Sequence, residues 1–362
     1  MRLALTGGGT GGHIFPALAV LDAVRASASP VEVCFFGPED RGERTLVEAA
    51  GVPFETVPSA AVRGRGPIGL IRSAWSLFSG VVTAVRRFRR FKPDAVFSTG
   101  GYGSFPGSVA ARLLRRPLVV YLPDVHPGWA VKAERMLATR MTTTTEAALE
   151  FLPPAKTTVT GYPVRATFFT LSRDAAREQL GLPLDAAVLL IAGASQGARA
   201  INAAVFDALP VVCEQAIVFH VTGDAGMAEA SARREALDLA IRNRYHPAPF
   251  RADLPVLMLA ADLGVFRAGA SVLGELPAAA LPSILIPGTF AGGHQRNNAN
   301  WLAGNGAAAV LEEAAITALG AMAGELLRDR SRLDSMRTSA RALARPDAAA
   351  AIAAVVMEVA RK

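Results

Sequence analysis

Residues 3–21 read LALTGGGTGGHIFPALAVL, and this stretch decides the fold of the first half of the chain. The apolar run at 3–5 predicts a strand, and the helical run that follows has Pro16 in its first turn, where the missing N–H costs nothing. Five glycines between Gly7 and Gly12 leave almost no side chain, so backbone N–H groups can approach a ligand closely. A helix N-terminus aimed at this loop suits an anionic group, and the loop delivers the titratable His13 to the mouth of the site.

Three interpretations of this loop compete. The spacing Gly7-x-Gly9-x-x-Gly12 matches a dinucleotide-binding fingerprint, but the residue after the second predicted strand, 31–36, is Gly37 and not the acidic residue that would hold a ribose. The second interpretation is a tight turn with a helix-capping histidine. The third is a sugar-nucleotide enzyme, and the remaining motifs of the chain favour it.

The bulk composition limits the class of protein. The chain has 362 residues, enough for two domains, and its content of 51% hydrophobic and 19% charged residues excludes disorder. The 2 cysteines, Cys34 and Cys213, show no metal-ligand spacing, which fits a reduced, cytoplasmic setting. The first residues lack the pattern of a signal peptide, and no uninterrupted run of about 18 apolar residues predicts a membrane span.

Apolar strands alternate with helical segments along the chain, which predicts an α/β protein with two Rossmann-like domains. The second half opens like the first, with a buried strand at 186–192, a glycine loop at 193–198 and a helix from about Ile201. The other strands are predicted at 31–36, 95–98, 118–122, 217–221, 263–266 and 283–286. Such sheets are parallel and bind ligands at the carboxyl ends of their strands, so we expect the active site in a cleft between two facing halves.

A joint at Gly161-Tyr162-Pro163 separates the two halves. We therefore expect an N-terminal domain at 1–162 and a C-terminal domain at 163–345. The alanine-rich tail from about Ala348 predicts a helix, and we expect this last segment, 346–362, to pack back on the N-terminal domain.

The net charge of +7 is concentrated in one stretch, from Arg63 to Lys92. Large apolar residues such as Trp75 and Phe78 are interleaved with its arginines, which is typical of a surface that lies on an anionic membrane. The alternative is an amphipathic helix whose apolar face is core and whose arginines are merely solvated. Nucleic acid is disfavoured, because no recognition motif accompanies the basic residues.

Four further clusters complete the pattern of motifs. They are Ser98-Thr99-Gly100-Gly101-Tyr102-Gly103, Gly161-Tyr162-Pro163-Val164-Arg165, Arg267-Ala268-Gly269-Ala270 running on to Glu275, and His294-Gln295-Arg296-Asn297-Asn298-Ala299. Together with the two glycine loops, these clusters resemble the GT-B glycosyltransferases of family 28. The resemblance runs in order over nearly the whole chain.

The resemblance implies transfer of N-acetylglucosamine from UDP-GlcNAc to the C4 hydroxyl of the muramic acid in lipid I, which gives lipid II in peptidoglycan synthesis. It also implies an inverting enzyme on the inner face of the cell membrane, with the basic stretch where the family docks. Departure of UDP leaves negative charge that a helix N-terminus and backbone N–H groups can stabilise without a metal or cofactor. The sequence contains no Asp-x-Asp pair, which disfavours a metal-dependent transferase of the other major fold.

The resemblance assigns a set of donor-side residues. Ser195 would border the diphosphate, Arg165 would contact a phosphate, and Glu275 would accept hydrogen bonds from the ribose hydroxyls. The backbone near Phe250-Arg251 would meet the uracil, and the amides of the last cluster would contact the sugar hydroxyls. The full donor set is Thr10, Gly11, Gly12, Arg165, Ser195, Gln196, Gly197, Arg251, Ala270, Glu275, His294, Gln295 and Asn298.

The acceptor side is assigned to Gly9, Thr10, Tyr102 and Asp124. The reaction needs one general base for the acceptor hydroxyl, and His13 is the first choice. His294 is an alternative base, but it adjoins the donor sugar and fits better as part of that pocket. For His220 and His246 we expect structural or surface roles.

Two departures from the family pattern leave alternatives open. The family carries a His-Glu-x-Asn segment where this chain has 121-YLPDVHPG-128, so Asp124 or His126 could take over its acidic or basic role. The family's Arg-Ser-Gly-Ala is Arg267-Ala268-Gly269-Ala270 here. The open alternatives are a GT-B transferase with another lipid acceptor, a UDP-GlcNAc 2-epimerase-like enzyme, and an inactive UDP-sugar-binding scaffold.

Overall fold

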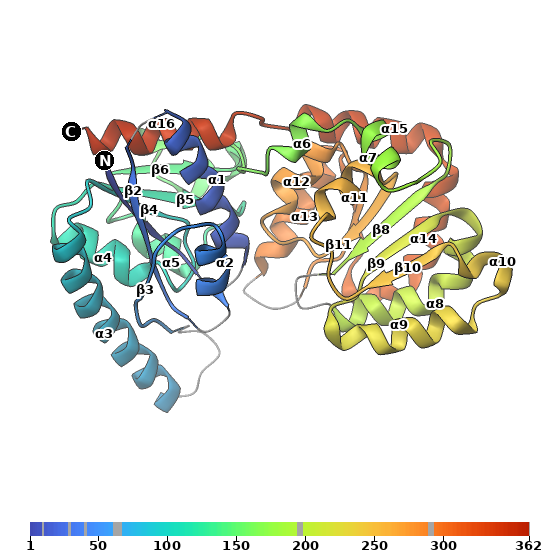
Figure 1. Cartoon of the computed structure of the whole chain (residues 1–362), viewed down its shortest axis with the longest axis horizontal. Coiled ribbons are helices and arrows are strands. Elements are labelled where there is room, and N and C mark those ends of the chain that lie inside the picture. The colour runs from blue at the N-terminus through green and yellow to red at the C-terminus, as the bar shows by residue number, and fades with distance from the viewer. Residues whose placement is uncertain are drawn as a thin grey trace. The chain divides into compact units, whose positions relative to one another are not determined.

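The computed structural model describes residues 1–8, 11–27, 30–39, 42–60, 67–193, 198–288 and 293–361. The chain divides into two compact units. Unit 1 comprises Met1–Val164 and Arg345–Lys362, and unit 2 comprises Arg165–Ala344. Figure 1 shows that each unit is a twisted sheet covered by helices.

Unit 1 is built on a parallel seven-stranded sheet in the order β3-β2-β1-β4-β5-β6-β7. Its strands are β1 (Arg2–Thr6), β2 (Glu32–Gly37), β3 (Phe54–Thr56), β4 (Ala95–Ser98), β5 (Leu118–Leu122), β6 (Arg140–Thr143) and β7 (Thr157–Val159). Its helices are α1 (Gly11–Ser27), α2 (Glu43–Ala49), α3 (Pro67–Phe91), α4 (Phe105–Leu113), α5 (Trp129–Glu134) and α16 (Ala348–Ala360), with 3₁₀ turns η1 (Glu146–Phe151) and η2 (Pro154–Lys156). The central strands are apolar almost without interruption because helices bury both faces of the sheet.

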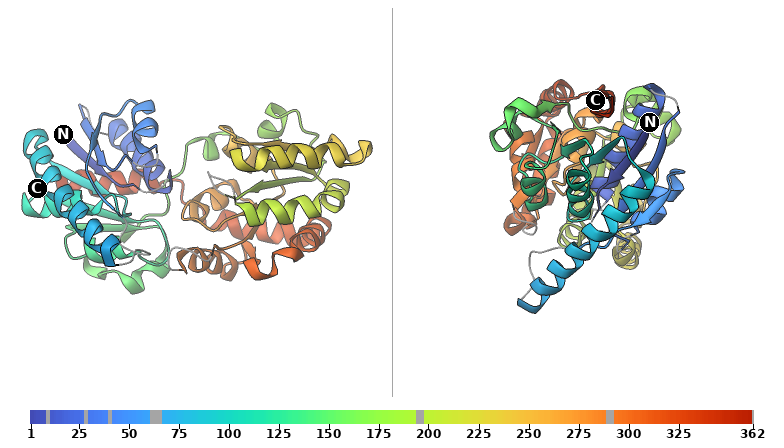
Figure 2. Two further views of the ribbon diagram at one scale, coloured as in Figure 1. Left: turned by 90° about the horizontal axis from the view of Figure 1, so that it is seen from below. Right: turned by 90° about the vertical axis from the view of Figure 1, so that its left-hand side faces the viewer.

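The longest helix of unit 1, α3, has one buried stripe. Ser73, Gly80, Ala84 and Phe88 are buried at helical spacing. The ring of Phe88 meets the edge of Phe36 from β2 at a centroid distance of 4.9 Å, which fixes the second half of α3 on the sheet. The first half of the helix extends beyond the rest of unit 1 (Figures 1 and 2).

The last helix of the chain returns to unit 1, where α16 packs against α1 (Figure 1). Ile352, Ala353 and Val356 of this helix are fully buried. Arg345, just before the helix, reaches Glu146 with a nitrogen–oxygen distance of 2.8 Å. The burial of α16 explains why the tail is rich in alanine, since a small side chain lets two helices approach closely.

Unit 2 has a parallel six-stranded sheet in the order β10-β9-β8-β11-β12-β13. Its strands are β8 (Val188–Ala192), β9 (Ile217–Val221), β10 (Tyr245–Ala248), β11 (Leu263–Phe266), β12 (Ser283–Leu285) and β13 (Ala308–Val310). Its helices are α6 (Thr167–Thr170), α7 (Arg173–Gln179), α8 (Arg199–Gln215), α9 (Asp224–Ala236), α10 (Leu239–Arg242), α11 (Leu254–Ala260), α12 (Val272–Ala279), α13 (His294–Gly304), α14 (Leu319–Arg328) and α15 (Arg330–Ala342), with the 3₁₀ turn η4 (Glu313–Ala318).

An ionic cluster anchors α7 at the amino end of the unit 2 sheet. The buried guanidinium of Arg177 lies 2.7 Å from Asp262 and also donates to the carbonyls of Ala260 and Ala186. The same carboxylate accepts the Val188 N–H at 2.9 Å. These bonds satisfy a buried charge on every side, which is the condition for keeping it inside a protein.

The structure confirms the predicted α/β class and the predicted strands at 95–98, 118–122, 217–221 and 263–266. One local prediction was wrong. Helix α1 begins at Gly11, so Pro16 is the sixth residue of the helix and does not lie in its first turn.

Candidate active site

The first loop of unit 1 follows β1 and is packed against the segment that follows β4. A Cβ on Gly7 would collide with the Thr99 hydroxyl, and a Cβ on Gly101 would collide with the carbonyl oxygen of Gly8. Both loops therefore need glycine at their contact, and Gly8 and Gly101 also have positive φ angles. The predicted residues Gly9 and Thr10 lie outside the described residues, and Gly11 and Gly12 form the start of α1.

His13 occupies the first turn of α1 and reaches across to the second loop. Its Nδ1 lies 2.9 Å from the carbonyl oxygen of Thr99. Because a carbonyl oxygen can only accept, Nδ1 carries the proton, and the neutral ring presents an unprotonated Nε2. That edge of the ring faces Gly101, where an added Cβ would lie 3.2 Å from Nε2. The arrangement gives His13 a fixed tautomer in which Nε2 is the proton acceptor.

The interior proline of α1 has a compensating partner. Pro16 has no N–H to donate to the carbonyl of Gly12, four residues earlier. The hydroxyl of Tyr162 donates to that carbonyl at 3.3 Å. Tyr162 is buried, so this bond replaces the missing one and ties the first turn of α1 to the end of unit 1.

The segment from Ser98 to Ser104, called the serine-flanked turn below, rests on a buried carboxyl group. Glu134, the last residue of α5, accepts hydrogen bonds from Ser104 at 2.6 Å, from Ser108 at 2.8 Å and from Ser98 at 3.2 Å. Burial raises the pKa of Glu134 to about 7, against the opposing effect of the three serine hydrogen bonds. Glu134 was not among the predicted site residues, because a lone glutamate in a short helix carries no distinctive pattern.

The segment after β5 holds the candidates Asp124 and His126. The imidazole of His126 meets the ring of Phe151 edge-on at a centroid distance of 4.5 Å. Tyr121, at the end of the same strand, is buried and hydrogen-bonded to Thr144 at 2.7 Å. Burial raises the pKa of Tyr121 well above its ordinary value, and the charge of Asp124 adds to the effect. These contacts join His13 with the serine-flanked turn and join His126 with η1.

In unit 2, the second glycine loop leads directly into α8. A Cβ on Gly193 would collide with Ala198, so this strand-to-helix turn also needs glycine. Ser195, Gln196 and Gly197 lie outside the described residues. Helix α8 starts at Arg199 and runs for 17 residues, which places the positive end of its dipole at the loop.

Two predicted donor residues of unit 2 face each other. A guanidinium nitrogen of Arg165 lies 3.7 Å from a carboxylate oxygen of Glu275 on α12. Burial raises the pKa of Glu275, while Ser271 and Arg165 oppose the rise. The Arg165 side chain is 45% exposed and that of Glu275 is 21% exposed, so both remain accessible to a ligand.

The amides of α13 are engaged with neighbouring backbone. Gln295 accepts the Gly288 N–H at 2.8 Å, and the fully buried Asn298 donates to the carbonyl of Ala268 at 3.1 Å. Asn298 therefore anchors the Arg267–Ala270 segment, which contains Ala270, from behind. His294 is the first residue of the same helix and is half-buried.

Arg251, a further predicted donor residue of unit 2, forms an ion pair within its own loop. Its guanidinium makes two bonds to Asp253, at 2.7 and 2.6 Å, and these raise the pKa of Arg251. The neighbouring Phe250 is 69% exposed. The groups of this loop that remain for a ligand are its backbone and the exposed ring of Phe250, because Asp253 already neutralises the charge of Arg251.

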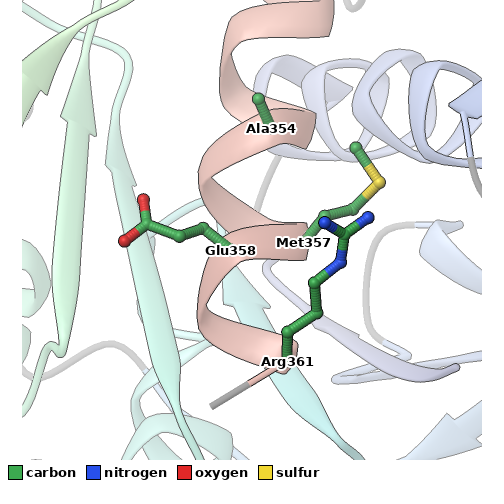
Figure 3. Close-up of a pocket in the computed structure, with 4 residues that line it drawn as sticks. All are labelled: Ala354, Met357, Glu358 and Arg361. Atoms are coloured by element: carbon green, nitrogen blue, oxygen red, sulfur yellow. The ribbon is translucent and has the colours of Figure 1, made fainter.

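Three further observations concern the described residues: a hollow beside α16, possible metal ligands and possible membrane-spanning helices. Figure 3 shows a hollow beside the last turns of α16, lined by Ala354, Met357, Glu358 and Arg361, and no predicted site residue lines it. Among the described residues, no three His, Cys, Asp or Glu side chains are placed to hold a metal ion. No described helix is long and apolar enough to cross a membrane.

Comparison with known sequences shows the family. Residues 3–143 match the glycosyltransferase family 28 N-terminal domain, and residues 188–352 match its C-terminal domain. A relative from Nitratidesulfovibrio vulgaris, the UDP-N-acetylglucosamine--N-acetylmuramyl-(pentapeptide) pyrophosphoryl-undecaprenol N-acetylglucosamine transferase, is 38% identical over 99% of this chain and 97% of its own. The protein with the same description from Listeria monocytogenes is 33% identical over 99% of each chain.

Solved structures agree on the fold. The crystal structure of Acinetobacter baumannii MurG matches with a TM-score of 0.76 and 25% identity over 99% of both chains. A UDP-GlcNAc 2-epimerase from Neisseria meningitidis matches with a TM-score of 0.68 at 14% identity, covering 99% of this chain and 100% of the other, and this likeness concerns the fold alone. The chain has the GT-B fold, and it belongs to glycosyltransferase family 28.

Proposed function

We propose that this glycosyltransferase moves N-acetylglucosamine from UDP-GlcNAc to the C4 hydroxyl of lipid I, giving lipid II. Full-length relatives of that description, 33% to 38% identical, support the substrates. We assign the acceptor and the membrane to unit 1 and UDP-GlcNAc to unit 2. Most of the proposed donor residues belong to unit 2, including Ser195, Gln196 and Gly197 beside the diphosphate, while Thr10, Gly11 and Gly12 of the donor set belong to unit 1.

The donor site in unit 2 would hold UDP-GlcNAc by charge and by hydrogen bonds. Arg165 would contact a phosphate, and Glu275 would accept from the two ribose hydroxyls. When UDP leaves, its diphosphate gains negative charge, and the N-terminus of α8 would stabilise that charge. The backbone dipoles at this helix N-terminus are fixed, so they need no reorganisation during the reaction.

The chemical step would be a direct displacement at the anomeric carbon. The C4 hydroxyl of the acceptor gives its proton to Nε2 of His13 while its oxygen forms the new bond to C1. The bond from C1 to the UDP oxygen breaks, so the α-linked donor yields a β-linked product. The observation that carries this assignment is the 2.9 Å contact from Nδ1 of His13 to the Thr99 carbonyl, which leaves Nε2 as the acceptor.

A kinetic comparison tests the role of His13. His13→Ala should lower kcat by about 100-fold or more while the affinity for UDP-GlcNAc stays the same. His246→Ala is the matched control, because this histidine is exposed and lies on β10. Near-normal kcat in the His13→Ala protein would transfer the role of base to Asp124 or His126. Supplying diacylglycerol in place of lipid I separates the proposed acceptor from another lipid.

We also infer that unit 1 docks on an anionic membrane through α3. Trp75 and Phe78 are 69% and 61% exposed, and their rings lie 5.9 Å apart. Arg72 and Arg86 are exposed on the same helix. Exposed aromatic rings beside arginines favour the lipid headgroup region. Not every arginine of α3 is available to lipid headgroups, because Arg87 forms an ion pair with Glu55. Arg63 and Arg65 lie outside the described residues. We assign this docking to the cytoplasmic face of the membrane, as the family resemblance implies.

A further inference from the structure

Three serine hydroxyls converge on a single buried carboxyl group in unit 1. Ser98 ends β4, Ser104 immediately precedes α4, and Ser108 lies within α4, so the three come from both ends of the serine-flanked turn and from the helix behind it. All three side chains and Glu134 are fully buried. The carboxyl group is therefore the common anchor of β4, α4 and α5.

The same hydrogen bonds continue into the backbone of the turn. The Gly100 N–H donates to the Ser98 hydroxyl at 3.2 Å, and the Ser104 hydroxyl lies 2.9 Å from the carbonyl of Gly101. Between these groups stands Thr99, whose carbonyl accepts from Nδ1 of His13. The chain of contacts thus runs from Glu134 through two serines to the peptide groups that orient the histidine.

The hydrogen bonds of this anchor depend on whether Glu134 is protonated. Ser104 has one hydroxyl proton, but its oxygen lies 2.6 Å from Glu134 and 2.9 Å from the Gly101 carbonyl. When Glu134 is ionised, all three serine protons can point at it. When Glu134 is protonated, it donates its own proton to one serine, and a serine proton becomes available for Gly101. Because the pKa of Glu134 is about 7, its ionised and protonated forms are both populated near pH 7.

We propose that Glu134 is a positioning residue for the acceptor, holding both ends of the serine-flanked turn and, through Thr99, the orientation of His13. The proposal rests on the assignment of this turn and of His13 to the acceptor side. Glu134 itself lies below the turn and touches no substrate. Its effect should therefore appear in acceptor kinetics and leave the donor site of unit 2 untouched.

The test compares Glu134→Leu, Glu134→Gln and Ser108→Ala in steady-state kinetics with a lipid I analogue and UDP-GlcNAc. Glu134→Leu should raise the acceptor KM by about tenfold and lower kcat, with the UDP-GlcNAc KM unchanged. Glu134→Gln, which keeps two hydrogen-bonding atoms, should restore most of the acceptor KM. Ser108→Ala removes one bond to the same carboxyl group away from the turn, so it should lower the melting temperature without changing either KM.

An unchanged acceptor KM in a folded Glu134→Leu protein would overturn the proposal, and so would an equal rise in both KM values. Should Glu134→Leu fail to fold, Ser104→Ala replaces it, because it removes the hydroxyl shared by Glu134 and Gly101. The His13→Ala experiment separates the two proposals. Normal kcat there would end the role of His13 as base, while a rise in acceptor KM in the Glu134 variant would still establish the positioning of the turn.

Discussion

Replacing Glu134 by glutamine should change how the stability of unit 1 depends on pH. The carboxyl group is fully buried, and burial raises its pKa from the ordinary 4.5 to about 7. Between these two values the folded protein keeps the proton and the unfolded chain has lost it. The free energy of unfolding from this group is therefore greatest below pH 4.5 and falls as pH rises through about 7.

The size of the effect follows from the two pKa values. Between about pH 5 and about pH 8, linkage gives a loss of roughly 2–3 kcal/mol in the free energy of unfolding from this one residue. Glutamine has no proton to lose, so Glu134→Gln removes the dependence. The difference in stability between the two proteins should thus change by that amount over this pH interval, whatever offset the altered hydrogen bonds add at a fixed pH.

Urea denaturation followed by tryptophan fluorescence measures the difference. Trp129 begins α5, the helix that ends at Glu134, and it reports on unit 1 when Trp75 and Trp301 are replaced by phenylalanine. Both the parent and the Glu134→Gln protein carry this background, so other titrating groups cancel in the comparison. A stability difference that stays constant from about pH 5 to about pH 8 would refute the account of a buried carboxyl group with a raised pKa.

Further predictions concern the donor site, the first turn of α1 and the membrane. Glu275→Ala should raise the UDP-GlcNAc KM by the equivalent of about 1–3 kcal/mol of lost hydrogen bonding, and an unchanged KM would remove this residue from the ribose site. Tyr162→Phe should lower the free energy of unfolding of unit 1 by about 0.5–1.5 kcal/mol, measured by urea denaturation, because the Gly12 carbonyl loses its partner. Changing Trp75 and Phe78 to alanine should weaken sedimentation with anionic vesicles. The control Met136→Ala removes another exposed apolar side chain of unit 1 and should not weaken it. Equal vesicle binding by both variants would contradict docking through α3.

Some apolar strands could be predicted from the sequence to the residue, whereas the predicted bounds of β1, β2, β8 and β12 differ from the observed ones by one or two residues. Strands β5, β9 and β11 match the predicted ranges because turn residues or polar residues bound each apolar run. Strands β3, β6, β7, β10 and β13 were not predicted. Each is only 3 or 4 residues long, and the sequences of β6 and β10, RMTT and YHPA, are partly polar, so pairing with a neighbouring strand makes them strands.

Part of the candidate site could likewise be predicted from the sequence, and part could not. The glycine loops, Arg165 and Glu275 could be singled out from motifs, because their chemistry depends on residue types at fixed spacing, whereas the contact between Arg165 and Glu275 is seen only in the structure. The role of Tyr162 opposite Pro16 could not, since the two residues are far apart in sequence and meet only in the folded unit. Glu134 was missed for the same physical reason, as its three serine partners come from other elements of the fold.

The most direct measurement is the transfer of labelled N-acetylglucosamine from UDP-GlcNAc to a lipid I analogue, with EDTA present and a control without acceptor. The proposed chemistry predicts an acceptor-dependent, β-linked product in undiminished yield. An α-linked product or a loss of product in EDTA would contradict direct, metal-independent displacement. Binding of UDP-GlcNAc with no transfer, or its conversion to an epimer without acceptor, would contradict the assignment of lipid I as the acceptor.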